Sequence, residues 1–499
     1  MGSAYILAID QSTQSTKAML FDDAGRVVAH ACEPHRQIIE RGSFVSHDLN
    51  EIAANILAVS RRVIESAGID KAAVKAIGVT NQRESVGVWD RATGAPIANS
   101  IVWQCNRAAG ITDALSAEEA EYVTRTTGLK LSPFFSAPKL AWLLNEVPGA
   151  RERAKRGELC CGTMDCFTVF VLTGGKSHRT DLSNASRMLL LNLDKGEWDE
   201  RLTNIFDIPA ALLPEIMDSD ACFGWSDLGG YLDAPIPIRA ALGDSHAALF
   251  AAGCHEAGDC MAGYGTGTCV MMNLGYKPVR SDKGINTSVA WRAGGNTLYL
   301  FDGVINYSGA VITWIVDELK LAASPAQTET LARQADPTDR TYLIPYFTGA
   351  SAPRWSNGSN AIFCGMTRST GRAELVRAAL ESLAYQTADV VFAMSEAAKQ
   401  RPVQMRVSGG PTKNAYLMQF QADLLDLEVL APENKEMTLQ GAAYMAGIAA
   451  GVYAGDLVNS SPIAEKYSPT MGKDERLLRL AGWERAASAA IKMQEERPL

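Results

Sequence analysis

An acidic residue followed by a glycine-rich loop lies at the middle of the 499-residue chain. Asp244 follows the mostly apolar run 236–242, and Gly265, Thr266 and Gly267 come further on. A carboxylate in such a place could accept a proton, and glycines let the backbone direct several N–H groups at an anion because they carry no Cβ. The same residues are also typical of a helix N-cap and a hairpin turn. The stretch therefore predicts either a phosphate site beside a general base or two ordinary turns.

A second acidic residue begins a hydroxyl-rich stretch near the N-terminus. Asp10 ends the apolar run 4–9 and is followed by Thr13, Ser15 and Lys17. Mg²⁺ takes oxygen ligands, and hydroxyl and ammonium groups can contact the oxygens of a phosphate. A solvated hairpin tip would have the same composition. The stretch is thus consistent with a site for Mg²⁺ and phosphate or with a plain turn.

Polar residues also follow a predicted strand in the first half of the chain. The run 74–80 is typical of a buried strand, and Arg83 and Glu84 come just after it. Ligands gather at the carboxyl ends of strands in α/β sheets, where an adjacent donor and acceptor would suit neighbouring hydroxyls of a polyol. Trp103 could pack against the carbon chain of such a molecule. The alternatives are a surface ion pair and a tryptophan of the core.

A similar hairpin is expected in each half of the chain. Residues 6–21 and 260–273 both have apolar arms and a small or polar tip. This pattern is typical of two antiparallel strands joined by a turn. Its repetition indicates that one sheet plan occurs twice. A further strand is expected at 404–407, followed by a turn at 409–412.

Apolar residues at helical spacing predict the helices. After Asp48 and Glu51, which form a capping-box pattern, apolar residues recur on one face of a helix. In the helix expected at 136–146 the leucines face the core and Lys139 is expected at the surface, whereas 181–187 is typical of a polar loop. Further helices are expected at 372–397, 413–425 and 436–447, the last being rich in small residues that suit close packing on a sheet.

Length, charge and cysteine content narrow the class of protein. A single core rarely serves 499 residues, so we expect domains at 1–248 and 249–499. A net charge of −9 disfavours nucleic acid or an anionic membrane as a partner. No uncharged apolar run is long enough to span a membrane, and the N-terminus lacks the basic region of a signal peptide. The ten cysteines show no CxxC spacing, which favours reduced thiols in the cytoplasm.

The order of the motifs along the chain adds a resemblance to a known family. The stretches that carry it are IDQSTQSTKAMLFD, GVTNQRESVGVWD, IVWQCNR, SPFFSAPKLAWLL, GDSHAALF, YGTGT, FTGASAPRW and SGGPTKNAYLMQFQADLL. Together they resemble the FGGY family of carbohydrate kinases and, within it, the glycerol kinases. The resemblance implies two actin-like, ribonuclease-H-like α/β domains, with ATP, Mg²⁺ and a small polyol or sugar in the cleft between them. It also implies an ATP-dependent phosphotransferase and, at the level of the family, a homodimer.

The resemblance implies a role for each matching residue. Asp244 matches the catalytic base, and Asp10 would help to place Mg²⁺ together with it. The residues that match substrate-binding positions are Arg83, Glu84, Trp103, Phe134, Asp244, Ser245 and Cys269. Those that match nucleotide-binding positions are Thr13, Gln14, Ser15, Lys17, Gly265, Thr266, Gly267, Gly309, Thr313, Gly410 and Asn414.

The substrate pocket departs from what is usual in glycerol kinases. They have Tyr where this chain has Phe134, Gln-Gln where it has Ser245 and His246, and Phe where it has Cys269. Losing the Tyr hydroxyl removes one hydrogen bond, typically worth ~0.5–1.5 kcal/mol, and the shorter side chains enlarge the pocket. A glycerol kinase-like activity is therefore expected, with the hypothesis that glycerol is not the best substrate. The alternative is a four- or five-carbon polyol or ketose of the erythritol, xylulose or ribulose type, whose added hydroxyl His246 could contact.

Two other classes of protein fit parts of this pattern. A non-catalytic ATP-binding scaffold would be expected to lack Asp10 or Asp244, and a sugar-sensing protein could lack the phosphate loops, but this chain has all of these features. Glycerol kinases regulated by fructose 1,6-bisphosphate carry a loop with Gly and Arg near the stretch 229–233, and no Arg is present there. We therefore expect an active kinase without that regulation.

Overall fold

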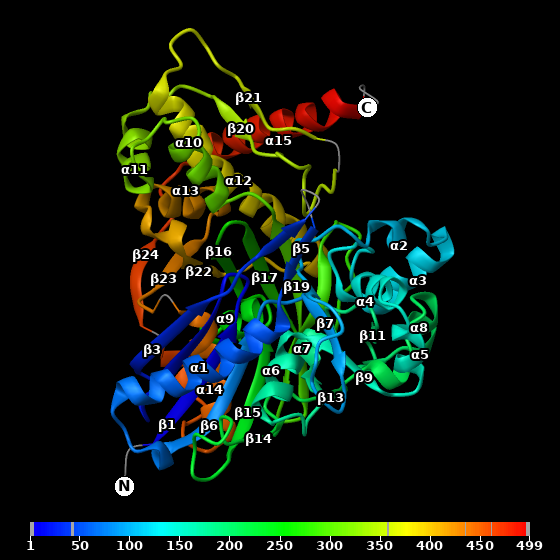
Figure 1. The fold of residues 1–499 in the computed structure, drawn as a ribbon. Coiled ribbons are helices and arrows are strands. Elements are labelled where there is room, and N and C mark those ends of the chain that lie inside the picture. The colour runs from blue at the N-terminus through cyan, green and yellow to red at the C-terminus, as the bar shows by residue number, and fades with distance from the viewer. Residues whose placement is uncertain (1–3, 41–43, 357–358, 435, 461, 496–499) are drawn as a thin grey trace.

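The computed structural model describes residues 4–40, 44–356, 359–434, 436–460 and 462–495, and within these ranges two large mixed sheets form the framework (Figure 1). The first sheet has the strand order β14-β15-β6-β1-β2-β3, with β1 (Tyr5–Gln11), β2 (Ser15–Phe21), β3 (Val27–Pro34), β6 (Val74–Asn81), β14 (Gly224–Ser226) and β15 (Ile236–Gly243). The second has the order β18-β19-β17-β16-β22-β23-β24, with β16 (Cys260–Tyr264), β17 (Thr268–Gly275), β18 (Asn286–Ala293), β19 (Asn296–Ile305), β22 (Gln404–Gly409), β23 (Glu428–Pro432) and β24 (Ile463–Tyr467).

Both sheets follow one plan, as the repeated hairpin predicts. β1 pairs antiparallel with β2, with Ile6 opposite Phe21, and β16 pairs antiparallel with β17, with Cys260 opposite Met272. On the other side of the hairpin, β6 and β15 run parallel to β1, and β22 and β23 run parallel to β16. The carboxyl ends of three parallel strands therefore meet at one edge of each sheet.

A smaller antiparallel sheet is built from segments of the first half of the chain. Its strand order is β4-β5-β8-β7-β9, with β4 (Ile38–Glu40), β5 (Phe44–His47), β7 (Val86–Asp90), β8 (Ser100–Ile101) and β9 (Leu159–Thr163). Short strand pairs are β10 (Arg179–Asp181) with β13 (Glu215–Met217), β11 (Leu191–Asn192) with β12 (Glu197–Trp198), and β20 (Tyr342–Ile344) with β21 (Ile362–Cys364).

Helices cover the sheets and fill the space between them. α1 (Leu49–Ala67) and α6 (Met164–Leu172) pack on the first sheet, and α12 (Arg372–Ala398) and α13 (Ala415–Leu425) pack on the second, in the upper part of Figure 1. The other helices are α2 (Ala109–Asp113), α3 (Ala117–Thr127), α4 (Ser136–Glu146), α5 (Ala150–Lys155), α7 (Leu182–Ala185), α8 (Glu200–Ile205), α9 (Asp244–Ala251), α10 (Gly309–Asp317), α11 (Pro325–Gln334), α14 (Met437–Ala449) and α15 (Lys473–Glu495). Among the described residues, no helix is both long enough and apolar enough to cross a membrane.

α9 and α14 share one apolar cluster with residues from both large sheets. The small residues of α14 permit this, as predicted for 436–447. A Cβ on Gly441 would lie 1.9 Å from the carbonyl oxygen of Ala247 in α9, and one on Gly78 in β6 would lie 2.2 Å from the carbonyl oxygen of Ala442. Because non-bonded atoms cannot approach so closely, glycine at both positions sets the distance of α14 from its neighbours. Residue 248, where the sequence predicts the domain boundary, lies within α9, and the boundary stays a prediction.

The expected surface position of Lys139 is wrong. Its side chain is fully buried, with an exposed fraction of 0%. Residues three and four apart share one face of a helix, so Lys139 lies on the same side of α4 as Ser136 and Leu143, which are also buried. The leucine pattern of this helix therefore placed the lysine in the core as well.

Two further local predictions are wrong. Asp48 caps α1 by accepting the N–H of Asn50, but Glu51 does not complete a capping box, because its carboxylate accepts the N–H of Arg36. The stretch 181–187 is not a loop, since it contains α7, which Asp181 caps. The helix expected at 413–425 begins two residues later, because a short 3₁₀ turn precedes it.

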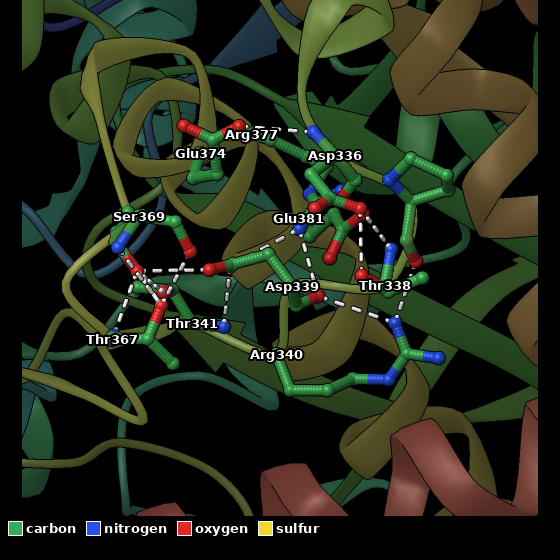
Figure 2. Close-up of polar contacts among 12 residues, drawn as sticks. Asp336, Thr338, Asp339, Arg340, Thr341, Thr367, Ser369, Glu374, Arg377 and Glu381 are labelled. Atoms are coloured by element: carbon green, nitrogen blue, oxygen red, sulfur yellow. Dashed lines mark hydrogen bonds and ion pairs between the residues drawn. The ribbon is translucent and has the colours of Figure 1, made fainter.

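A polar network holds the loops around the first turns of α12, as Figure 2 shows. The carboxylate of Glu374 accepts the N–H groups of Gly371 and Asp336, each at 2.9 Å. Asp339 accepts the N–H of Thr341 and faces Arg377, whose nearest nitrogen lies 3.3 Å away. These contacts join the start of α12 to the loop that precedes β20.

Candidate active site

The ends of three parallel strands of the first sheet bring together the predicted base, a predicted metal ligand and two predicted substrate-binding residues. Asp10 lies near the end of β1, Arg83 and Glu84 follow β6, and Asp244 follows β15 as the first residue of α9. The register of these strands makes their ends level. This edge is where open α/β sheets bind their ligands.

Arg83 connects Asp244 to the second sheet. Its Nε donates to Oδ1 of Asp244 at 3.2 Å, and its Nη1 donates to Oδ2 of Asp302, in β19, at 2.7 Å. Its Nη2 lies 3.6 Å from Sγ of Cys269, in β17. The N–H of Ser245 donates to the same oxygen of Asp244 at 2.6 Å. The structure thus brings together three predicted substrate-binding residues, Arg83, Ser245 and Cys269, and the predicted base.

Glu84 is held by a buried arginine. Nε of Arg187 donates to Oε1 of Glu84 at 2.6 Å, and its Nη1 donates to Oγ of Ser288 at 2.9 Å. The same Nη1 lies 3.3 Å from Oδ2 of Asp302. Burial opposes the charge of Asp302, but Arg187 and Arg83 keep the pKa of its carboxyl below the usual value. Two arginines and two carboxylates therefore form a fixed, charged wall of the site.

Trp103 joins the predicted aromatic wall to the predicted phosphate loop. Its Nε1–H donates to Oγ1 of Thr13 at 3.0 Å. Its ring meets the ring of Phe134 edge to face, with centroids 5.8 Å apart. The two predicted substrate-binding aromatics are therefore in contact, and one of them is bonded to a predicted nucleotide-binding residue.

The loop between β1 and β2 forms a tight turn. The N–H and the Oγ of Ser12 donate to the carbonyl of Ser15 at 3.0 and 2.8 Å. Nε2 of His35 lies 3.0 Å from the carbonyl oxygen of Thr13, within hydrogen-bonding distance of the backbone of the turn. Gln14 is exposed at its tip, and Ser15 is buried. These hydrogen bonds define the shape of the turn.

The loop between β16 and β17 is joined to the start of α10. The N–H of Gly265 donates to the carbonyl of Gly267 at 2.7 Å and closes the turn. The N–H of Gly309 donates to the carbonyl of Gly265 at 3.0 Å, and a Cβ on Gly309 would lie 2.4 Å from that oxygen. The carbonyl of Thr266 accepts the N–H groups of Ser308, just before α10, and of Ala310 within it, while Thr313 lies exposed one turn later. The loop and the predicted nucleotide positions of α10 thus form one unit.

The predicted nucleotide-binding residues Gly410 and Asn414 follow β22. Gly410 is exposed in a 3₁₀ turn, and Asn414 caps α13 by accepting the N–H of Leu417 at 3.0 Å. The Nδ2 of Asn414 donates to Oγ1 of Thr328 in α11 at 3.2 Å. Asn414 therefore holds two helices together, and its contact with a nucleotide stays a prediction.

Asp10 has the properties of a cation ligand. It is buried, and its Oδ1 has no hydrogen-bond partner among the described residues. Burial and the nearby Asp244 raise the pKa of Asp10 to about 8, against the opposing effect of Lys17, which itself lies 3.4 Å from Glu436. A divalent cation would relieve the repulsion between these carboxylates, so the residues fit Mg²⁺. No group of three or more His, Cys, Asp or Glu in the described ranges could hold a metal by itself. The remaining coordination positions of a Mg²⁺ ion would therefore be filled by phosphate oxygens and water.

The structure adds three residues to the site that the sequence did not assign. Arg187, Asp302 and Lys139 are fully buried next to Arg83 or Glu84. A single carboxylate in the apolar run 296–305 was the available signal for Asp302. His246 is also fully buried, and neither ring nitrogen has a hydrogen-bond partner within the described part of the chain. Its contact with a substrate hydroxyl stays a prediction.

The site brings together the predicted base, the predicted substrate-binding residues and two turns suited to phosphate, an arrangement typical of phosphotransferases that act on hydroxyl compounds. The chain belongs to the FGGY family of carbohydrate kinases. Residues 5–251 match the N-terminal domain of that family, and residues 260–450 match its C-terminal domain.

Individual relatives support the same assignment over the full length. The chain is 41% identical over 495 residues to a glycerol kinase from Alkaliphilus metalliredigens, covering 99% of both. It is 44% identical over 490 residues to a glycerol kinase from Alkalilimnicola ehrlichii, covering 97% of this chain and 98% of the relative. The crystal structure of Plasmodium falciparum glycerol kinase with ADP aligns with a TM-score of 0.92 at 30% identity, covering 98% of both chains. The protein is an ATP-dependent kinase with the actin-like, ribonuclease-H-like α/β fold.

Proposed function

We propose that this kinase transfers the γ-phosphoryl group of ATP to a hydroxyl of glycerol or of a somewhat longer polyol, with Asp244 as the general base. The observation that carries the proposal is the 3.2 Å bond between Arg83 and Asp244, beside Glu84, at the level ends of β6 and β15. A polyol bound by the arginine and by Glu84 would present a hydroxyl to the neighbouring carboxylate. The names of the relatives described above support the same substrate class.

In the proposed phosphoryl transfer, the protein need not form a covalent bond to either substrate. Phosphoryl transfer depends on alignment and on stabilising the charge of the phosphate oxygens. Arg83 and Glu84 would orient the polyol, and Asp244 would accept the proton of the attacking hydroxyl. Backbone N–H groups of the loop at Thr266 would face the phosphates. The same loop is bonded to the start of α10, which would hold these N–H groups in place.

Mg²⁺ would be held by Asp10 and Asp244, since the first of these has a buried oxygen without a partner among the described residues. When bound, the ion would offset the negative charge of the phosphates. Lys17 lies on the strand that follows and adds a second positive charge near Asp10. This arrangement supports ATP as the phosphoryl donor.

Two short side chains at the proposed polyol site favour a second candidate substrate. Ser245 and Cys269 have short side chains, and the latter contacts Arg83 through its sulfur at 3.6 Å. Space that a longer side chain would fill at these positions could take another carbon of the substrate. A four- or five-carbon polyol or ketose is therefore the alternative to glycerol.

A substrate panel tests the proposal. The purified protein would be mixed with ATP and Mg²⁺ and with glycerol, erythritol, threitol, pentitols, tetruloses or pentuloses in turn, and the phosphorylated product identified by ³¹P NMR. We expect product from at least one polyol and none without it. ATP hydrolysis without any phosphorylated polyol or ketose would contradict the proposal. The ratio of kcat/KM between glycerol and the longer compounds decides between the two candidates.

We place the protein in the cytosol. All ten cysteines are free in the structure, and most are buried. Free thiols are typical of proteins kept under reducing conditions, and ATP is supplied there.

A further inference from the structure

Lys139 is a buried lysine that contacts the backbone of Phe134, one of the residues of the proposed polyol pocket. It lies in the first turn of α4, and its ammonium group donates to the carbonyl oxygens of Phe134 and Phe135, the second at 3.2 Å. Its side chain is fully buried. Burying an ammonium group is costly unless its N–H groups are paired, so this position needs a reason.

The two carbonyls belong to the aromatic residues next to the pocket. The ring of Phe134 meets Trp103, and Nζ of Lys139 lies 5.8 Å from the centroid of the same phenylalanine ring. Phe135 lies under the guanidinium of Arg187, at 5.2 Å, and this arginine holds Glu84. One ammonium group is therefore bonded to the backbone of both aromatic residues.

The same turn of α4 is also attached to Glu84. Oγ of Ser136 donates to the carbonyl oxygen of Glu84 at 3.1 Å, and the N–H of Ala137 donates to the carbonyl of Met188 at 2.9 Å. Glu84 has a φ of 61°, in the left-handed region that non-glycine residues rarely adopt. Its conformation therefore depends on neighbours such as this turn.

We propose that Lys139 is a positioning residue that sets the width of the polyol pocket, by holding the turn at Phe134 and Phe135 at a fixed distance from Glu84. This inference rests on the proposed function. Because Phe134 has no hydroxyl, it contributes to substrate binding only through the place of its ring. A change in that place alters how long a polyol can lie between the ring and Glu84.

The Lys139→Met variant tests the inference, since Met keeps the length of the side chain and removes its N–H groups. The purified full chain would be compared with the wild type in the substrate panel, together with polyol binding by calorimetry. We expect the KM and Kd of the preferred polyol to rise by about ten-fold, and the preference between three-carbon and longer polyols to change by at least about five-fold. The KM of ATP should stay within about two-fold, since Lys139 does not contact the phosphate loops.

Lys155→Met is the matched control, because it makes the same change at an exposed position of α5. If Lys139→Met folds poorly, Lys139→Gln, whose amide can still donate to one carbonyl, takes its place. Unchanged polyol affinity and preference in a folded variant would overturn the inference, and so would equal losses for polyol and ATP, or unfolding of both variants. Failure of the wild type to phosphorylate any polyol would instead overturn the proposed function.

Discussion

Arg187 holds together the buried charged residues of the site. It is fully buried, and it bridges Glu84 and Asp302, which the chain brings together from distant segments. Removing one partner from a buried charged network leaves the others without compensation, and this costs more than the loss of a surface pair. The position of Glu84 therefore depends strongly on its ion pair with Arg187.

Replacing Arg187 by Met should lower the free energy of unfolding by about 3–5 kcal/mol, because two carboxylates would remain buried with fewer partners. Urea unfolding followed by circular dichroism measures this change. Arg179→Met, which removes the partly exposed ion pair with Glu215, is the control and should cost less than about 1 kcal/mol. Equal losses in the two variants would show that the buried network is not special.

Lys139 should make stability depend on pH in a defined direction. Burial, opposed by Glu84 and Cys105, lowers its pKa from 10.5 to about 7. Between these values the unfolded chain binds more protons at this position than the folded chain does. The free energy of unfolding of the wild type should therefore rise relative to that of Lys139→Met as the pH increases from about 7 towards 10. Unfolding curves of both proteins at several pH values measure the difference, and a constant or falling difference would contradict the lowered pKa.

The site residues at the strand ends could be predicted from the sequence, but their buried partners could not. Asp244, Arg83 and Asp10 follow apolar runs, so their place at a sheet edge could be predicted from local pattern. The partners Arg187 and Asp302 come from segments far apart in the chain, and no local pattern indicates that they meet. Lys139 could have been placed in the core, because its spacing from Leu143 already put it on the buried face of α4.

At the level of elements, α9 and α14 connect the catalytic edge to the rest of the fold. α9 begins with Asp244, and its backbone at Ala247 is in close contact with Gly441 of α14. α14 also packs against β1, β6 and β15. A displacement of α14 would therefore reach the helix that carries the proposed base.

Gly441→Ala should destabilise the protein by about 1–3 kcal/mol, since the added Cβ would overlap the carbonyl of Ala247. Thermal unfolding measures the loss, and turnover should fall as well because α9 carries Asp244. Gly110→Ala in α2, where nothing lies within 4 Å of the added Cβ, is the matched control and should be neutral or slightly stabilising. If Gly441→Ala were as stable as this control, the close packing of α14 would not matter.

The hairpins and long helices could be predicted because their patterns are local. The hairpin 6–21 forms as predicted, with Ile6 opposite Phe21, and α12 covers the expected range with one residue more. The small sheet containing β4, β5, β7, β8 and β9 was not predicted as a unit, because its strands are short and pair across long stretches of chain. The capping of α1 was predicted only in part, since Glu51 has a tertiary partner that competes with the local one.

For the whole molecule, the two sheets divide the work of the proposed reaction. The first sheet carries Asp10, Asp244 and the proposed hydroxyl-binding pair Arg83 and Glu84. The second carries the loop at Thr266 and the predicted nucleotide-binding residues that follow β22. Asp302 is the contribution of the second sheet to the polyol side, through its bond to Arg83. Both substrates are therefore expected where the two halves face each other.

Removal of Mg²⁺ should abolish turnover without abolishing polyol binding. With EDTA present, turnover should fall by at least about 100-fold, because the phosphates lose the charge that the ion supplies. Polyol affinity measured by calorimetry should change little, since Arg83 and Glu84 bind hydroxyls without the metal. Equal loss of polyol binding and turnover would indicate that the metal has a structural role instead.

The central claim is that Asp244 accepts the proton of a polyol hydroxyl during phosphoryl transfer. The measurement that tests it most directly is the turnover of Asp244→Asn at saturating ATP, Mg²⁺ and polyol, with polyol and nucleotide binding measured on the same preparation. The account predicts that kcat falls by about 10²–10⁴-fold while the folded variant still binds both ligands. A kcat close to that of the wild type would contradict the role of Asp244 as the base and, with it, the mechanism proposed for this site.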